Sequence, residues 1–222
     1  MEIPPVDIWG LLFERDLPYP NDHIIFQSHD NTKGYTLNHI RTHAQSFGHA
    51  LQAHWSWRKG DVLLVMAPNH IDVPAIIWGC HWAGGVVAPV NPALSAEELR
   101  RQLESSRARG VIVHPEVYAT AKEAVARYPH LSEDRILVLG EQVDQFIRTA
   151  EQPSTSHRVA INPSTDTAFL VYSSGTTGRP KGVMVSHRNV VAGVVLQSLV
   201  DGTHVHYTRD KLLAALPIYH IY

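Results

Sequence analysis

The feature that most constrains the fold is the alternation of short apolar runs with longer segments of helical periodicity. Short runs rich in Val, Ile and Leu predict buried strands, and apolar residues spaced three or four apart predict helices. The predicted strands are residues 24–26, 62–66, 86–90, 111–113, 136–139, 168–172 and 212–216. The predicted helices are residues 7–15, 36–51, 72–82, 95–103, 116–127 and 189–200. Strands joined by helical crossovers predict an α/β fold with a doubly wound, mostly parallel sheet and flanking helices.

Three helix starts carry residues that commonly cap a helix. Asp7 and Thr36 stand immediately before the first apolar residue of a periodic segment, where a side-chain oxygen can accept from a free backbone N–H. Ser95 is followed three residues later by Glu98, which is the spacing of a reciprocal capping box. These positions set the predicted boundaries of the corresponding helices.

A polar loop follows the strand predicted at residues 168–172. The loop contains four hydroxyl side chains, two glycines and then Lys181, and a second apolar run follows at residues 183–185. Glycines let backbone N–H groups turn towards an anion, hydroxyls donate hydrogen bonds, and a lysine supplies a compact positive charge. In doubly wound sheets ligands bind beyond the carboxyl ends of the strands. The composition and order of this loop predict a phosphate-binding site.

The residues of this loop allow two other interpretations to be compared with a phosphate site. A Ser, Thr and Gly cluster between two strands is often only a polar hairpin. The nucleotide-binding pattern G-x-x-x-x-G-K-[ST] does not fit, because Gly175 and Gly178 are three apart, Lys181 follows Pro180, and Gly182 stands where Ser or Thr is required.

The same stretch resembles the signature of the adenylate-forming superfamily, which includes acyl- and aryl-CoA synthetases, luciferases and peptide-synthetase adenylation domains. The pattern [ST]-[SG]-G-[ST]-T-G-x-P-K-G is matched at every specified position by residues 173–182. In that family the loop binds the β- and γ-phosphates of ATP. The resemblance implies phosphate contacts from Ser173, Ser174, Gly175, Thr176, Thr177, Gly178 and Lys181.

The last residues resemble the next signature of the acyl- and aryl-CoA ligases. Pro217, Tyr219 and His220 match a proline, an aromatic and a histidine that line the carboxylate pocket in that family, and Tyr222 falls where plant 4-coumarate–CoA ligases carry a tyrosine against the aryl acid. Amino-acid adenylation domains usually have Phe-Asp in place of Tyr219-His220. The alternative is that these side chains belong to the core.

The resemblance implies an ATP-dependent carboxylic acid–CoA ligase that uses ATP, Mg²⁺ and coenzyme A. The acid is expected to be an aryl or arylalkenyl acid; a fatty acyl-CoA synthetase, a luciferase-like enzyme and a non-catalytic nucleotide-binding module are the alternatives. Residues 1–58 are expected to pack partly on later chain, and residues 59–222 to form the sheet subdomain of the N-terminal part of the large domain. Without a C-terminal domain, these residues alone are expected to be inactive and to associate through exposed apolar surface.

Composition argues against several other classes. The net charge of −2 and the charged fraction of 18% do not indicate a nucleic-acid partner, although Trp55 and Trp57 lie beside Arg58 and Lys59. Prolines and glycines divide the uncharged stretch 73–96, which predicts core rather than a membrane span.

The cysteine and the histidines bear on the cellular compartment and on metal binding. The single Cys80 favours a reducing, intracellular compartment, and the resemblance makes this cytoplasmic or peroxisomal. The pairs His39/His43 and His204/His206 lack a third ligand at zinc-site spacing, so no metal site is predicted.

Overall fold

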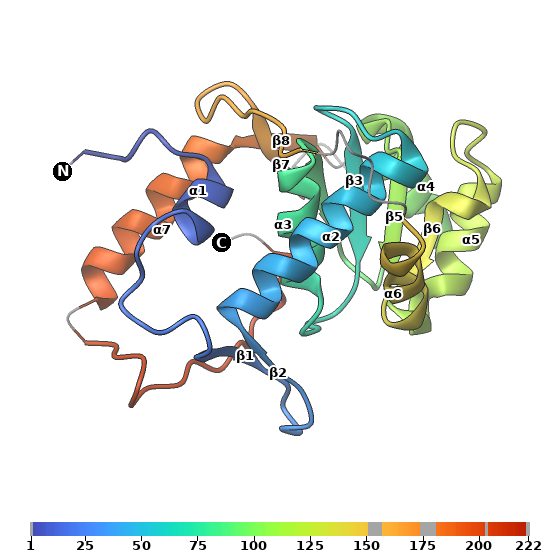
Figure 1. Cartoon of the computed structure of the whole chain (residues 1–222). Coiled ribbons are helices and arrows are strands. Elements are labelled where there is room, and N and C mark those ends of the chain that lie inside the picture. Colours follow the sequence, from blue (N-terminus) through green and yellow to red (C-terminus); the bar gives the residue numbers. More distant parts are fainter. Residues whose placement is uncertain (1, 151–156, 174–180, 203, 221–222) are drawn as a thin grey trace.

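The computed structural model describes residues 2–150, 157–173, 181–202 and 204–220. A six-stranded sheet forms the centre, with strand order β6-β5-β3-β4-β7-β8, and a separate hairpin pairs β1 with β2. The strands are β1 (Ile24–Gln27), β2 (Gly34–Thr36), β3 (Val62–Met66), β4 (Val86–Val90), β5 (Gly110–Val113), β6 (Ile136–Val138), β7 (Thr167–Ser173) and β8 (Lys181–Ser186). All neighbours in the large sheet are parallel except β7 and β8, which are antiparallel. The predicted α/β fold with a mostly parallel sheet is confirmed (Figure 1).

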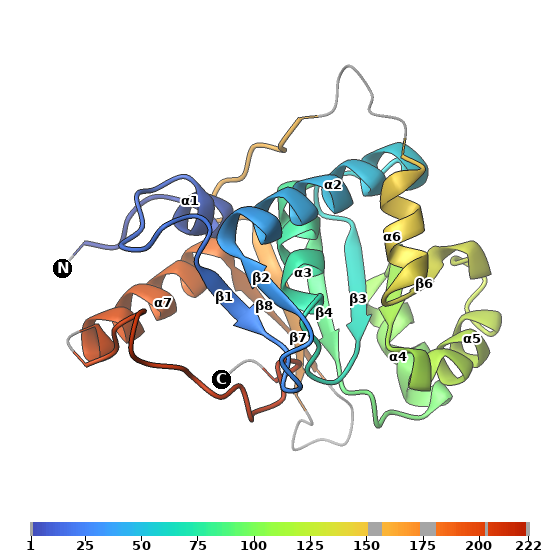
Figure 2. The same ribbon diagram turned by 60° about the horizontal axis from the view of Figure 1, so that its bottom comes forward.

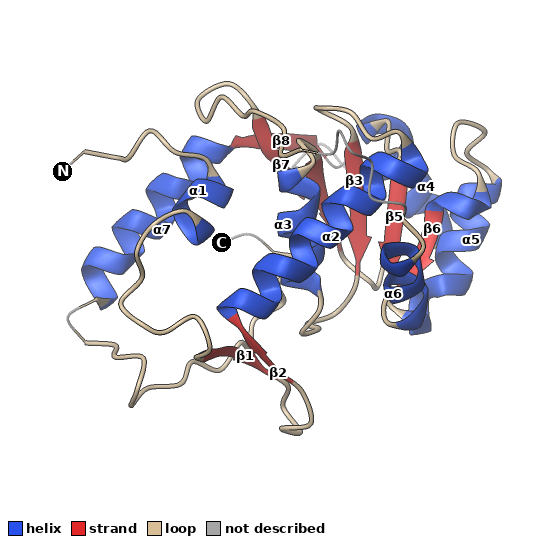
Figure 3. Ribbon diagram, viewed as in Figure 1, coloured by secondary structure: helices blue, strands red, loops and turns tan. Residues whose placement is uncertain are grey.

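Helices cover both faces of the sheet (Figure 3). They are α1 (Ile8–Phe13), α2 (Leu37–Trp55), α3 (Val73–Trp82), α4 (Ala96–Ser106), α5 (Tyr118–Ala126), α6 (Glu141–Arg148) and α7 (His187–Asp201). Two short 3₁₀ helices, Pro115–Val117 and Glu133–Arg135, precede α5 and β6. The predicted caps are confirmed: Asp7 accepts from the N–H of Gly10, Thr36 accepts from that of His39, and Ser95 forms its capping box.

The two faces of the sheet bury two separate cores, because successive side chains of a strand point to opposite faces. Leu63 and Val65 of β3 pack in the core formed with α1, α2, α3 and α6. Leu64 and Met66 of the same strand pack in the core formed with α4 and α5. Strands buried on both sides explain the uninterrupted apolar runs in the sequence.

Helices α2 and α3 approach each other closely on one face of the sheet. A Cβ on Gly79 would lie 2.5 Å from the carbonyl oxygen of Ala44, and a Cβ on Gly48 would lie 2.6 Å from the ring of Trp82. The two glycines therefore allow the helix backbones to meet at a distance that no side chain permits.

The N-terminal segment is attached to the rest of the molecule through α1. Arg158 donates to both carboxylate oxygens of Asp7, and the backbone N–H of Ile8 donates to Nδ1 of His187 at 3.5 Å. The His187 ring in turn lies 5.1 Å from the ring of His81, whose Nε2 donates to the carbonyl of Ala168 at 3.0 Å. This buried row connects α1, α7, α3 and β7.

Three parts of the sequence prediction need correction. Residues 212–216 are not a strand: Leu212 and Leu213 are 83% and 88% exposed, and the carbonyls of Ala214 and Leu216 accept from a side chain instead of a strand. Helix α6 and strand β2 were not predicted. The predicted segment 116–127 is a 3₁₀ turn followed by a shorter helix.

In the described residues, no helix is both long and apolar enough to cross a membrane.

Candidate functional site

The ends of the predicted phosphate loop lie opposite each other on adjacent strands. Ser173 is the last residue of β7, Lys181 is the first residue of β8, and the two are register partners in the antiparallel ladder. Both residues are solvent exposed. The site residues Ser174, Gly175, Thr176, Thr177 and Gly178 lie outside the described residues, so their predicted phosphate contacts stay predictions.

The loop ends lie at the carboxyl edge of the parallel strands. Strand β7 runs parallel to β4, and β4 runs parallel to β3. The end of β7, where Ser173 stands, is therefore at the same edge of the sheet as the ends of β3 and β4 (Figure 2). At this edge the hydroxyl of Tyr172 lies 2.5 Å from Oγ of Ser105 in α4. That contact fixes the end of β7 against the helix beside it.

The side chain of Asn69 is hydrogen-bonded to the segment that carries the second predicted motif. Asn69 follows β3, and its Nδ2 donates to the carbonyls of Ala214 at 2.7 Å and Leu216 at 2.9 Å. Its Oδ1 accepts from the N–H of Ile218 at 2.8 Å. One amide therefore satisfies three backbone groups of a segment that pairs with no strand.

The predicted pocket residues lie directly beyond that anchor. The rings of Tyr219 and His220 are 4.7 Å apart, and the N–H of His220 donates to the carbonyl of Pro217 at 3.0 Å in a turn. Tyr219 is half-buried and His220 is exposed. Tyr222 lies outside the described residues. Since Asn69 follows β3, this motif and the loop ends are both attached to the carboxyl edge of the sheet.

Further polar side chains, not identified from the sequence, gather at the same edge. The hydroxyl of Tyr35 donates to Asp72 at 2.5 Å, and Nδ1 of His70 lies 3.6 Å from the same carboxylate. The rings of His70 and His114, which follow β3 and β5, are 6.0 Å apart. Burial lowers the pKa of His70, and burial together with the Asp72 hydrogen bond raises that of Tyr35. The sequence signal that could have identified His70 and His114 is that both are polar residues in the connections that follow buried strands.

The groups at the two loop ends suit recognition of an anionic ligand. In the parts of the chain that the structure describes, no group of three or more His, Cys, Asp or Glu side chains is placed to hold a metal ion. Lys181 brings a positive charge to the β8 end of the loop, and Ser173 brings a hydroxyl to the β7 end. A lysine and hydroxyls around a glycine-containing turn can neutralise and orient phosphate groups.

Replacing Asn69 with alanine is expected to release the segment around residues 214–218, because three backbone groups lose their partner. Limited proteolysis followed by mass spectrometry should show faster cleavage near Leu216, with little change in cleavage elsewhere. Asn38→Ala is a suitable control, since the Asn38 side chain accepts only from Arg41 on the surface of its own helix. Equal cleavage rates in wild type and Asn69→Ala would contradict this role.

Comparison with known proteins gives consistent results. The family model described as AMP-binding enzyme matches residues 13–222. A putative acyl-coenzyme A synthetase of Emericella nidulans is 30% identical over 217 residues, which cover 90% of this chain and 39% of the relative. A 4-coumarate–CoA ligase-like protein of Oryza sativa is 38% identical over 181 residues, covering 74% of this chain and 31% of the relative. The chain thus spans well under half the length of these relatives.

Solved structures show the same fold. A long-chain-fatty-acid–CoA ligase of Archaeoglobus fulgidus matches with a TM-score of 0.84 at 22% identity, over 99% of this chain and 44% of that one. An anthranilate CoA ligase, solved with anthranoyl-AMP, matches with a TM-score of 0.75 at 25% identity, over 92% of this chain and 38% of that one. On the family match, which extends over nearly the whole sequence, the chain belongs to the AMP-binding enzyme family.

Proposed function

We propose that this chain is part of an ATP-dependent carboxylic acid–CoA ligase. In the proposed first step the acid's carboxylate attacks the α-phosphate of ATP, the bond to the β-phosphate breaks, and acyl-AMP and pyrophosphate form. In the second step the thiol of coenzyme A attacks the acyl carbon, and the thioester forms as AMP leaves. The observation that carries this proposal is the Ser173–Lys181 pairing, which brings together the two ends of a family-matching signature at the carboxyl edge of the sheet.

The proposed roles of the residues follow from their chemistry. Lys181 is a counter-charge for phosphate, Ser173 and the loop hydroxyls donate hydrogen bonds, and Mg²⁺ accompanying ATP shares the neutralisation. Tyr219 and His220, with Tyr222, shape the carboxylate end of the pocket. Asn69 positions the segment that carries Tyr219 and His220, since it bonds to the backbone on both sides of Pro217.

The proposed acid is an aryl or arylalkenyl acid. The sequence around Tyr219 and His220 supports it, and so do relatives named 4-coumarate–CoA ligase-like 5 and anthranilate CoA ligase. A fatty acid is the second candidate, because a relative of Salmonella typhimurium named long-chain-fatty-acid–CoA ligase is 27% identical over 84% of this chain. The proposed compartment is intracellular, either cytoplasmic or peroxisomal; a relative of Arabidopsis thaliana is named peroxisomal OPC-8:0-CoA ligase 1.

Acid-dependent exchange between ATP and labelled pyrophosphate tests the proposal. We expect exchange with cinnamate- or benzoate-like acids when the chain is extended to the length of its relatives, and none with residues 1–222 alone. Lys181→Ala should lower the exchange rate at least tenfold, because it removes a charge that stabilises the transferring group. Lys211→Ala, at an exposed position in the segment before the second motif, is the control.

The outcomes separate the alternatives. Exchange only with fatty acids would replace the proposed acid and keep the reaction. Failure of a folded, full-length protein to exchange with any aryl, fatty or amino acid would favour a nucleotide-binding module without catalysis. Acyl-AMP formation by residues 1–222 would contradict the proposal that these residues are inactive alone.

We also propose that residues 1–222 associate with themselves through exposed apolar surface. Met184 of β8 is 74% exposed, Leu199 and Val200 of α7 are 59% and 68% exposed, and Leu213 is 88% exposed. Large exposed apolar side chains of this kind favour association. Sedimentation velocity should show concentration-dependent oligomers that decrease in Met184→Gln/Leu213→Gln. A wild type that stays strictly monomeric as its concentration is raised would contradict this association.

A further inference from the structure

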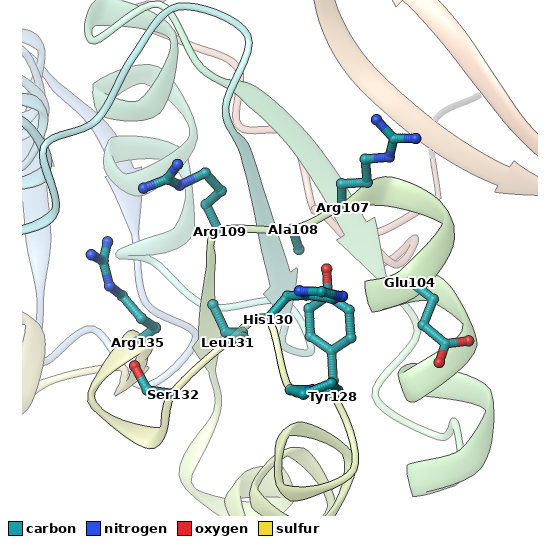
Figure 4. Close-up of a pocket in the computed structure, with 10 residues that line it drawn as sticks. Glu104, Arg107, Ala108, Arg109, Tyr128, His130, Leu131, Ser132 and Arg135 are labelled. Carbon is teal, nitrogen blue, oxygen red and sulfur yellow. The ribbon is translucent and has the colours of Figure 1, made fainter.

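A cavity of about 710 Å³ lies away from the predicted site. It is formed by the C-terminal end of α4, the start of β5, and the connection from α5 to β6 (Figure 4). Its charged lining residues are Glu104, Arg107, Arg109 and Arg135, and His130 also lines it. The lining thus contains three guanidinium groups and one carboxylate.

The cavity is at the amino ends of β5 and β6. Arg109 directly precedes β5 and Arg135 directly precedes β6, while the N–H of Arg109 donates to the carbonyl of Val62 at the start of β3 at 2.9 Å. Among the described residues, neither Ser173 nor Lys181 lines the cavity. Tyr172, at the end of β7, contacts α4 at Ser105.

The three arginines are incompletely neutralised. Among the described residues, the Arg107 guanidinium has no ion pair and no hydrogen bond. Arg109 forms an ion pair with Asp61, with Nε 3.7 Å from the carboxylate, which is longer than a hydrogen bond. Arg135 donates to the backbone carbonyl of Trp55 at 3.1 Å and lies over the indole ring, 5.3 Å from its centroid. That carbonyl is neutral, so it leaves the charge of Arg135 uncompensated.

The nearby acids do not remove this excess of positive charge. Glu104, the carboxylate in the lining, is ion-paired with Arg100 on the same helix. Burial, followed by repulsion from the Arg109 guanidinium, lowers the pKa of Arg135 even though Asp134 and Asp61 act in the opposite direction. Two guanidinium groups that repel each other beside a cavity are stabilised by an anion bound near both.

The remaining lining is apolar and aromatic. Tyr128 is 4% exposed, Leu131 is 7% exposed and Ala108 is 2% exposed. The rings of Tyr128 and His130 are 5.4 Å apart in an edge-to-face arrangement, and Figure 4 shows both between the Arg107 and Arg135 sides of the pocket. A few charged groups beside buried apolar side chains are typical of a small-molecule site.

We propose that this cavity binds a small organic phosphate, separately from the adenylating site. Arg109 and Arg135, whose guanidinium groups lie on the same side of the cavity in Figure 4, hold the phosphate, and the organic part of the ligand packs against Tyr128 and Leu131. A phosphate dianion matches several guanidinium groups better than a single carboxylate does, because its oxygens accept from the planar N–H pairs of more than one arginine.

Calorimetric titration of residues 1–222 with phenyl phosphate tests this inference. We expect saturable binding with one site in the cavity and weaker binding of inorganic phosphate, which lacks the organic part. Arg109→Gln and Arg135→Gln should each raise the Kd at least tenfold. Arg127→Gln is the matched control: Arg127 is also exposed and close in sequence, but it is paired with Glu123 at 2.7 Å and does not line the cavity. Lys181→Ala controls for binding at the phosphate loop.

The location is tested separately by chemical modification. Phenyl phosphate should protect Arg109 and Arg135, but not Arg127, from phenylglyoxal, as read by peptide mass spectrometry. Thermal melting verifies that each variant is folded, and Arg109→Lys should bind more tightly than Arg109→Gln. The inference is overturned by a lack of saturable binding, by equal weakening in Arg127→Gln, or by loss of binding in Lys181→Ala with the arginine variants unchanged.

Discussion

Gly79→Ala is expected to lower the free energy of unfolding by about 3 kcal/mol, which is the upper part of the range for overpacking a core. The added methyl group would lie 2.5 Å from the carbonyl oxygen of Ala44 and 3.0 Å from the ring of Phe47. The first of these is backbone of α2, so relief requires the two helices to separate. That movement would open the core that both helices share with β3. Urea denaturation at neutral pH measures the change.

Gly193→Ala is the matched control for this prediction. Gly193 is also inside a helix, α7, but a Cβ there meets no atom within 4 Å. Alanine has the higher helix propensity, so this variant should gain up to about 1 kcal/mol. If Gly79→Ala and Gly193→Ala change the free energy of unfolding in the same direction, the close approach of α2 and α3 does not determine the effect of Gly79→Ala.

Lowering the pH from 7 to 5 is expected to reduce the free energy of unfolding by about 2 kcal/mol through His81. Burial, and next the neighbouring His187, lower the pKa of His81 to about 3, from the 6.5 that is usual for histidine. Between these two values the unfolded chain binds a proton that the folded protein does not, so stability falls as the pH falls below 6.5. His187, whose pKa is also lowered by burial, adds to the same trend.

His81→Gln should flatten this pH dependence, since glutamine keeps an N–H for the carbonyl of Ala168 and does not titrate. Denaturant titrations at pH 7, 6 and 5 give the slope. The window lies above the range in which most carboxylates titrate, so their contribution is small. His204→Gln, at an exposed position, should leave the slope unchanged. An unaltered slope in His81→Gln would show that other groups control the acid response.

Much of the fold was predictable because local signals agreed with the tertiary structure. Thr36 and Ser95 cap their helices as their residue types require. The strands at 62–66 and 86–90 lie in the middle of the sheet, where burial on both faces leaves a plain apolar run. Strands and caps of this kind depend mainly on neighbouring residues, so the sequence alone identifies them.

The errors arose where partners distant in sequence decide the structure. The apolar run 212–216 has the composition of a strand, but the amide of Asn69, about 145 positions earlier, takes the place of a neighbouring strand. Helix α6 follows Gly140, which makes no side-chain cap, so it lacked a start signal. In the sequence, Asn69 is recognisable only as a polar residue in the connection after a strand. The arginine-lined cavity was not predicted because its arginines come from two separate connections, Arg107 and Arg109 from that between α4 and β5 and Arg135 from that between α5 and β6.

The pairing of Ser173 with Lys181 has a consequence for the affinity of any ligand of the loop between them. Bringing the ends of a chain segment together costs conformational entropy, and here the β7–β8 ladder, which extends back to Thr167 and Ser186, meets that cost when the protein folds. A ligand that contacts residues 174–180 therefore meets a segment whose ends are already fixed. Less of the ligand's interaction energy is then needed to order the chain. A stable β7–β8 hairpin therefore increases the affinity of the loop for such a ligand.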